Sequence, residues 1–332
     1  MFRCLFITWL MLLLCSSNTT AQLRIPLLNK LDSMLEVRQK TPKTDTNYVV
    51  RPDSRWTLRL INNLSGTNFT LKLTMFDDSK ANVRFWDPLR HTVTLSANYR
   101  GLAVAFAVNP EHLFGRKTST EFNINSYSNR YGFDFIYEKN GSFEGTVRWG
   151  DIYEHLNDEI EESSMTINGY YAFNGRKFSY PAAFSQSFIQ KRSAGSLMLG
   201  ASFHHGSVDI VNQDEEYYQE DNIRKIKLNY FSVGVGYGYN FVPHRQWLLH
   251  LSALPSLVLW RENKVVMMGH NEELPATFPE ISLVGRASVV HYFKHFFAGL
   301  TLVYNYSSAG DYESIRIRHY KWRTRLILGK RF

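Results

Sequence analysis

The residues most able to do chemistry in this chain are basic side chains near its C-terminus. They recur at alternate positions of the segment 315–332, and the set comprises His319, Lys321, Arg323, Arg325 and Arg331. The positions between them are mostly apolar from Tyr320 onward. Because successive side chains of a strand point to opposite faces, this period of two predicts a strand with one basic and one apolar face. Stacked Arg and Lys side chains can select anions in a pore, or they can pair with acids.

Other charged residues are expected on the same inward face of their predicted strands. These residues are Arg55, Arg59, Glu121, Asp134 and Arg286. In the narrow interior of a barrel, opposite charges must pair or stay hydrated. One interpretation is a structural salt-bridge network that stiffens and closes the barrel. The other is a basic constriction that selects anionic solutes. The sequence leaves both open.

Three glycines are also expected to face the interior. Gly234, Gly236 and Gly238 share one face of a predicted strand, opposite Tyr237 and Tyr239. They would either admit bulky neighbouring side chains or keep a passage open. No helix follows them, which excludes a phosphate-binding loop. No Asp-rich loop has the spacing of an EF-hand, and we expect neither a metal ion nor another cofactor.

Segments of alternating polarity fill the chain after Arg55. They predict an all-β, antiparallel, up-and-down transmembrane barrel of about 12 strands, within a range of roughly 10–14. Short turns alternate with long polar loops at 77–90, 140–163, 206–222 and 262–279. This asymmetry is typical of outer-membrane barrels, and it places Phe332 at the periplasmic face. The segment 174–193 becomes a long periplasmic connection, which we expect to fold into the interior or to cap it.

The alternative fold is a soluble β-sandwich or lipocalin-like barrel with its apolar face inside. The segments 223–241 and 315–332 exceed the usual length of soluble strands, about 3–10 residues, and are long enough to cross a bilayer. A mean hydropathy of −0.29 and an aromatic content of 15% also fit strands with a polar inner face and aromatic girdles outside. The net charge of +8 is dispersed along the strands, so we expect no nucleic-acid partner.

The first 21 residues predict a secretory signal peptide. Arg3 precedes an apolar run at 5–14, and small residues precede a cleavage site after Ala21. Lipidation at Cys15 remains an alternative, although Leu14 is bulkier than the residue that usually precedes a lipidated cysteine.

The chain has only two cysteines, Cys4 and Cys15, and both lie in the predicted signal peptide. The mature protein is therefore expected to lack disulfides and thiolate chemistry. We predict three segments: the signal peptide over 1–21, a periplasmic leader over 22–54 and the barrel domain over 55–332.

A lipid-modifying enzyme would need a nucleophile, a base and an orienting group near the outer leaflet. Ser202 and His204 stand near the outer end of one predicted strand, with His204 facing the interior and His205 facing lipid. The chain has no Gly-x-Ser-x-Gly motif. We assign no catalytic residue.

Three groups of motifs resemble a known family. They are RP at 51–52 with RWTLRL at 55–60 and LSG at 64–66, YRGL at 99–102 with NRYGFD at 129–134, and FSYPAAFSQS at 178–187 with QKRSAGS at 190–196. Together they resemble a family of secreted, barrel-like proteins from Bacteroidota known as domain of unknown function 4421. The resemblance covers about residues 51–332. It implies an outer-membrane location, and it supplies neither an assigned activity nor catalytic residues.

We therefore predict an exported protein of the cell outer membrane. Its partners would be outer-membrane lipid and the barrel-assembly machinery, which would recognise the last strand ending at Phe332. The leading hypothesis is a small channel or solute-binding barrel with a basic lumen. The alternatives are a structural or assembly barrel with a closed lumen, and an outer-membrane lipid hydrolase or acyltransferase. The sequence specifies no ligand and no oligomeric state.

Overall fold

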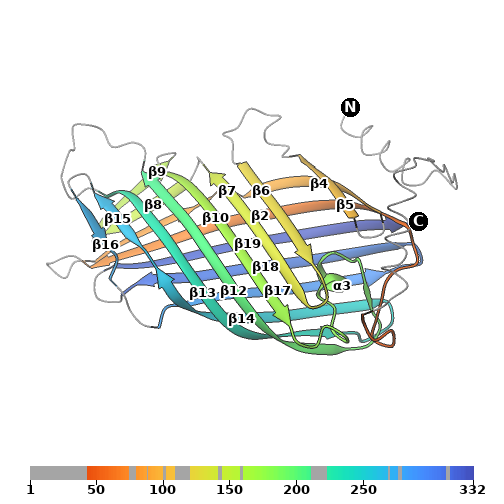
Figure 1. Cartoon of the computed structure of the whole chain (residues 1–332). Coiled ribbons are helices and arrows are strands. Elements are labelled where there is room, and N and C mark those ends of the chain that lie inside the picture. The colour runs from red at the N-terminus through yellow and green to blue at the C-terminus, as the bar shows by residue number, and fades with distance from the viewer. Residues whose placement is uncertain are drawn as a thin grey trace, which may run out of the picture.

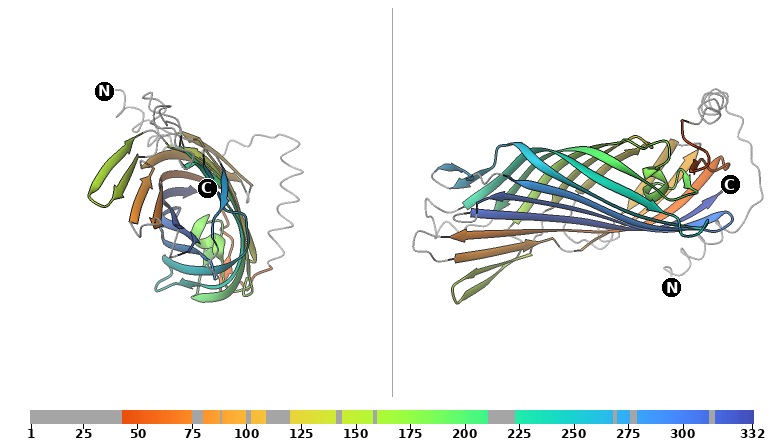
Figure 2. Two further views of the ribbon diagram at one scale, coloured as in Figure 1. Left: turned by 90° about the vertical axis from the view of Figure 1, so that its left-hand side faces the viewer. Right: turned by 90° about the horizontal axis from the view of Figure 1, so that it is seen from below.

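The chain forms one long antiparallel sheet that is strongly curled (Figure 1 and Figure 2). Buried side chains lie on its inner face. The computed structural model describes residues 43–74, 80–87, 89–99, 102–108, 120–140, 144–157, 160–210, 223–267, 270–275, 279–311 and 315–332. The predicted signal peptide, both cysteines and the leader up to residue 42 lie outside the described residues.

Twelve strands follow one another around the sheet, each antiparallel to its neighbour. In spatial order they are β5 (Leu102–Val108), β4 (Arg90–Tyr99), β2 (Trp56–Thr74), β19 (Ile315–Arg331), β18 (Phe296–Gly310), β17 (Ile281–Tyr292), β14 (Trp247–Arg261), β13 (Ile223–Phe241), β12 (Ala194–Ile210), β10 (Ile160–Ala172), β7 (Tyr131–Asn140) and β6 (Thr120–Tyr127). The predicted all-β antiparallel fold and the predicted number of strands are confirmed. The last strand, β19, pairs with the first long strand, β2, along nearly its whole length.

Among the described residues, further short strands extend the end of the sheet that lies opposite the C-terminus (Figure 1). They are β3 (Lys80–Trp86), β8 (Glu144–Trp149), β9 (Ile152–Asn157), β15 (Lys264–Met267) and β16 (Asn271–Glu273). The prediction of continuous loops at 77–90, 140–163 and 262–279 is therefore wrong in part. Strand β3 pairs with both β2 and β8. The outward positions of β3 carry charged residues, so its sequence resembles that of a loop.

The outer face of the sheet is apolar and the inner face is polar. On β19, Leu326 and Leu328 are 50% and 47% exposed, whereas His319 and Lys321 are 6% and 8% exposed. On β13, Tyr237 is 51% exposed, and the same alternation continues on the neighbouring strands. A soluble barrel would show the reverse arrangement, because its apolar side chains would be inside.

The connection between β10 and β12 folds into the interior, as expected, and we call its residues 174–193 the plug. It contains the helix α3 (Tyr180–Phe184), all of whose residues are buried, at the end of the sheet where the chain terminates (Figure 2). The Ser179 hydroxyl accepts a hydrogen bond from the Ala182 backbone N–H, and Pro181 lies in the first turn, so the helix start is well defined.

Part of the predicted leader packs against the plug. The strand β1 (Val49–Val50) pairs with β11 (Ile189–Gln190), which follows α3 in the plug. Residues 43–54 therefore belong structurally with the plug. No helix in the described part of the chain is long and apolar enough to cross a membrane.

Candidate functional site

A buried carboxylate, Glu138, lies at the centre of the charged interior. It comes from β7 and has no exposed surface. Its carboxylate pairs with the Lys321 ammonium and lies 3.3 Å from the Arg323 guanidinium and 3.7 Å from that of Arg90. Arg90 also pairs with Asp87 at 2.7 Å. Because Lys321 and Arg323 come from β19 and Arg90 from β4, these ion pairs cross the interior.

Asp134 forms a second buried ion pair on the same face of β7. Its carboxylate pairs with Arg286 of β17 and accepts a hydrogen bond from the Tyr127 hydroxyl. The Asp134 and Arg286 side chains are each 4% exposed. The Arg286 guanidinium also lies 5.6 Å from the centre of the Tyr180 ring of α3. This ion pair therefore links two opposite strands to the plug.

The remaining predicted interior residues differ in their placement. Arg59 donates to the Ser185 carbonyl of the plug at 2.9 Å, and Arg325 lines the same cavity as Arg323 and Asp134. Arg55 was expected in the interior, but its side chain is exposed, because β2 begins only after it. The side chain of Glu121 lies outside the described part of the structure.

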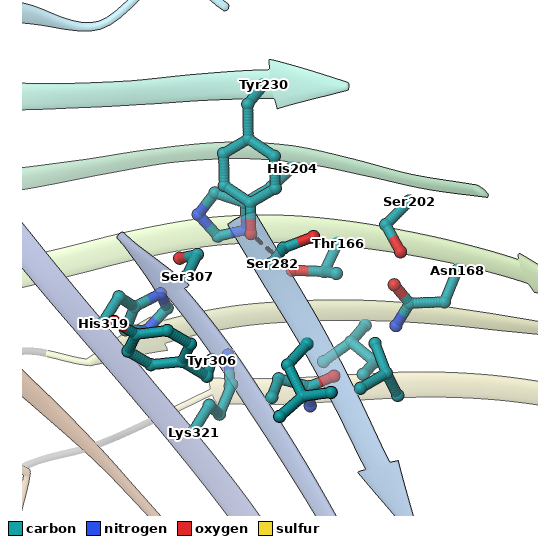
Figure 3. Close-up of a pocket in the computed structure, with 14 residues that line it drawn as sticks. Thr166, Asn168, Ser202, His204, Tyr230, Ser282, Tyr306, Ser307, His319 and Lys321 are labelled. Carbon is teal, nitrogen blue, oxygen red and sulfur yellow. Dashed lines mark hydrogen bonds between the residues drawn. The ribbon is translucent and has the colours of Figure 1, made fainter. Parts of the chain in front are cut away.

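Beyond Lys321 the interior continues into a polar cavity of about 30 Å³ (Figure 3). The His319 ring stacks on Phe69 with centroids 4.3 Å apart, and its centroid lies 5.6 Å from that of His204. Thr166 Oγ1 and His204 Nδ1 form a hydrogen bond of 2.9 Å. A cavity of this volume holds on the order of one water molecule.

Among the described residues, this cavity does not bring a nucleophile, a base and an orienting carboxylate into contact with one another. Ser202 lines the cavity, but the Nδ1 atom of His204 forms its hydrogen bond with Thr166 and not with Ser202. No carboxylate is found among the described residues that line it. His205 is exposed on the outer face, as expected. The described residues also contain no group of three or more His, Cys, Asp or Glu side chains that could hold a metal ion.

The barrel wall holds the plug through the backbone carbonyls of the plug. Four wall side chains donate to them: Arg59 to Ser185 at 2.9 Å, Arg331 to Gln186 at 2.8 Å, Asn240 to Ser179 at 2.8 Å and Tyr292 to Ala182 at 3.3 Å. The plug side chains Phe178, Tyr180 and Phe184 belong to a buried apolar cluster that includes wall residues of β14, β17 and β18. The plug is therefore packed into the end of the interior next to the C-terminus, where a cavity of about 780 Å³ remains between residues 43–53, the turn at 128–131 and Phe188.

The three glycines of β13 face the interior, and other groups occupy the space beside them. A Cβ atom at Gly238 would lie 3.0 Å from the Phe178 ring of the plug. One at Gly236 would clash with the Ala253 carbonyl of β14, and one at Gly234 would clash with the neighbouring part of the same strand. These glycines permit close packing of the plug and of β14.

A second interior cavity, also of about 30 Å³, lies among Asp134, Glu138, Arg286 and Arg325. Sites for small-molecule ligands usually have about 300–1,000 Å³. These two cavities leave room for water between the ion pairs, but not for a solute of that size.

Sequence reasoning missed three residues of this interior. Glu138 lies four positions after Asp134 and so on the same strand face, a signal that the period of two already contained. Arg90 was assigned to a loop, although it begins β4. Tyr127 stands beside the predicted turn at 128–130, and only the three-dimensional structure brings it to Asp134.

The fold and the interior define an antiparallel barrel with an apolar outer face and a charged, plugged interior. The chain belongs to the family described as domain of unknown function (DUF4421), whose model matches residues 43–332. The match begins at the residues that pack on the plug. No curated protein matches the chain.

Several solved structures of outer-membrane proteins are similar to this chain at low identity. The outer membrane protease OmpT from Escherichia coli is 9% identical, with 85% of this chain and 97% of that chain covered and a TM-score of 0.43. The translocator domain of the autotransporter NalP from Neisseria meningitidis is 10% identical, with 94% and 100% covered and a TM-score of 0.31. OprG from Pseudomonas aeruginosa is 9% identical, with 84% and 97% covered and a TM-score of 0.28. At these values the likeness carries no argument about activity.

Proposed function

We propose that this protein is an outer-membrane barrel whose interior is closed at rest, and that it serves as a structural or assembly component. The main support is the set of ion pairs that cross the interior between β7, β4 and β19, with Glu138 in contact with three cations. The plug is held in the end of the interior next to the C-terminus through both hydrogen bonds and apolar contacts.

The membrane location is supported by the apolar outer face of the long strands. The stretch from Tyr320 to Phe332 extends about 40 Å along β19, or about 28 Å along the membrane normal at a tilt of about 45°. This length matches the apolar band of about 25 Å seen on outer-membrane barrels. Export by the N-terminal signal peptide, contact with outer-membrane lipid and recognition of the Phe332 strand by the barrel-assembly machinery are parts of the same proposal.

The test is current recording from the refolded protein in planar bilayers. We expect insertion without stepwise conductance. Arg59→Met combined with Arg331→Met removes two donors to the plug carbonyls and should give intermittent openings. Lys330→Met is the control. It also removes a positive charge near the C-terminus, but the Lys330 ammonium lies 4.7 Å from the Phe332 ring and does not hold the plug. Stepwise conductance of the unaltered protein would contradict the closed interior.

A channel with a basic lumen is the second candidate, and one observation favours it. The three cations near Glu138 outnumber the carboxylates of Glu138 and Asp87 that pair with them, and Arg59 and Arg325 add positive charge nearby. An open form of this barrel should therefore prefer anions. If the unaltered protein conducts, Arg323→Glu with Arg325→Glu should reverse the ion preference, and unchanged selectivity would exclude this lumen as the filter.

A further inference from the structure

A basic surface lies on the outer face of the sheet, at the end opposite the plug. It consists of outward-facing residues of β19, β2, β3 and β8, namely Arg316, Arg318, Lys72, Lys80, Arg84 and Arg148, which we call the outer basic patch. The residues that alternate with them, such as Ile317, Leu71 and Val83, are buried on the inner face. The interior ion pairs therefore do not include the patch, and the functions considered above do not use it.

The strand register places these cations in two adjacent rows. In the first row, Arg318 lies opposite Thr70, which lies opposite Arg84 on the next strand. In the second row, Arg316 lies directly opposite Lys72. Since neighbouring strands are about 4.8 Å apart, Arg318 and Arg84 are separated by about 10 Å at the backbone.

The height of the patch matches the surface of the outer leaflet. The rings of Tyr320 on β19 and its partner Tyr306 on β18 lie with centroids 5.2 Å apart, and Trp86 lies in the same row two strands away from Tyr320. Aromatic side chains of this kind mark the interface between the apolar and polar zones of a membrane. Arg318 and Arg316 follow Tyr320 in the direction away from Phe332, so they lie at headgroup level.

The opposite side of the same end provides a contrast. On β13 and β15, Lys227 lies opposite Lys264, but Lys264 pairs with Glu262 at 2.7 Å and Glu273 lies directly opposite it. Lys225 pairs with Asp209 at 2.8 Å. Cations there are neutralised by acids of the chain itself. Within the described residues, neither Arg84, Lys72 nor Arg318 forms an ion pair with a carboxylate of the chain.

We propose that the outer basic patch binds the phosphate groups of a phosphorylated glycolipid in the outer leaflet. Thr70 and Ser308 lie in the same row as Arg318 and Arg84 and add hydroxyl groups for phosphate and sugar oxygens. Cations about 10 Å apart within the first row, together with the second row beside it, suit a ligand that carries more than one phosphate. The proposal rests on the membrane orientation given above, but not on whether the interior is closed.

The experiment measures binding of a fluorescent diphosphorylated glucosamine-disaccharide lipid to the folded protein in non-ionic detergent. The same lipid without its phosphates, and phosphatidylglycerol, are the comparison probes. Arg84→Glu with Arg318→Glu should weaken binding of the diphosphorylated lipid by about tenfold or more. Lys227→Glu with Lys264→Glu is the control, because it makes the same change in net charge at the same end of the sheet, and it should change binding less than about twofold. Heat-dependent gel mobility of every variant confirms folding.

Three results would overturn the proposal. They are equal binding of the phosphorylated and dephosphorylated lipids, equal loss in the two double variants, and equal binding of phosphatidylglycerol, which would mean that the patch attracts any anionic lipid. Failure of the protein to insert into bilayers would contradict the membrane barrel itself. Insertion together with any of the three results would contradict only the glycolipid site.

Discussion

Replacement of Glu138 by Gln should destabilise the barrel strongly, because its carboxylate is a shared counter-ion of buried Lys321 and Arg323 and also lies near Arg90, which pairs with Asp87 as well. The Glu138 side chain is fully buried, and those of Lys321, Arg323 and Arg90 are 9%, 11% and 5% exposed. Removing one partner of a buried ion pair leaves an uncompensated charge and costs about 3–5 kcal/mol. Gln keeps the shape of the side chain, so the lost free energy of unfolding reflects the missing charge and not a cavity.

The assay is urea-induced unfolding in detergent micelles, followed by tryptophan fluorescence and gel mobility. With an unfolding slope on the order of 2 kcal/mol per M, the midpoint of Glu138→Gln should fall by about 1.5–2.5 M. Glu262→Gln is the control at an exposed ion pair. The hydrogen bond and the charge of Lys264 lower the pKa of Glu262, so it is ionised at neutral pH, yet its loss should not shift the midpoint measurably.

A second substitution separates charge from packing. Lys321→Met in the Glu138→Gln background removes one uncompensated cation and should restore part of the lost stability. A loss below about 1 kcal/mol in Glu138→Gln would refute its role as the central counter-ion. A strong loss without any recovery in the double variant would show that Lys321 does not act through Glu138.

Two further predictions concern the plug. Phe178→Ala should cost about 3–5 kcal/mol of unfolding free energy, measured by the same urea titration, because Phe178 is fully buried in the apolar cluster; an unchanged midpoint would show that the plug does not contribute to stability. Gly238→Ala should cost about 1–3 kcal/mol, because its Cβ would lie 3.0 Å from the Phe178 ring, and Phe178→Leu should reduce that cost. Gly169→Ala is the control, since its Cβ would meet no atom within 4 Å; equal losses at the two glycines would refute the contact.

The long strands could be predicted from the sequence because each carries its own signal. In β13 and β19 the alternation of polar and apolar residues persists over many positions, and it sets both the strand and its faces. The short strand β3 was missed because its outward residues Lys80, Asn82 and Arg84 have the composition of a loop. Its assignment depends on pairing with β2 and β8, which no local pattern records.

The interior was predictable in its composition but not in its connections. The period of two identified Asp134, Arg286 and Arg323 as inward positions. Which carboxylate meets which cation depends on the curl of the sheet, which brings β7 opposite β17 and β19. Glu138 is an example. Its inward direction follows from the period of two in the sequence, but its three cationic partners lie on two distant strands and could not be predicted.

The cations inside this barrel and those of the outer basic patch differ in their counter-ions, and this difference supports two separate roles. Inside, Lys321, Arg323 and Arg286 meet carboxylates of the chain itself, because a buried cation without a counter-ion is too costly. Outside, Arg84 and Arg318 stand in rows with hydroxyl groups and lie next to the aromatic girdle. At the membrane surface an anionic lipid can supply the missing charge. The chain therefore compensates the charges that close its interior, and the glycolipid proposed above would supply the counter-ions of the outer basic patch.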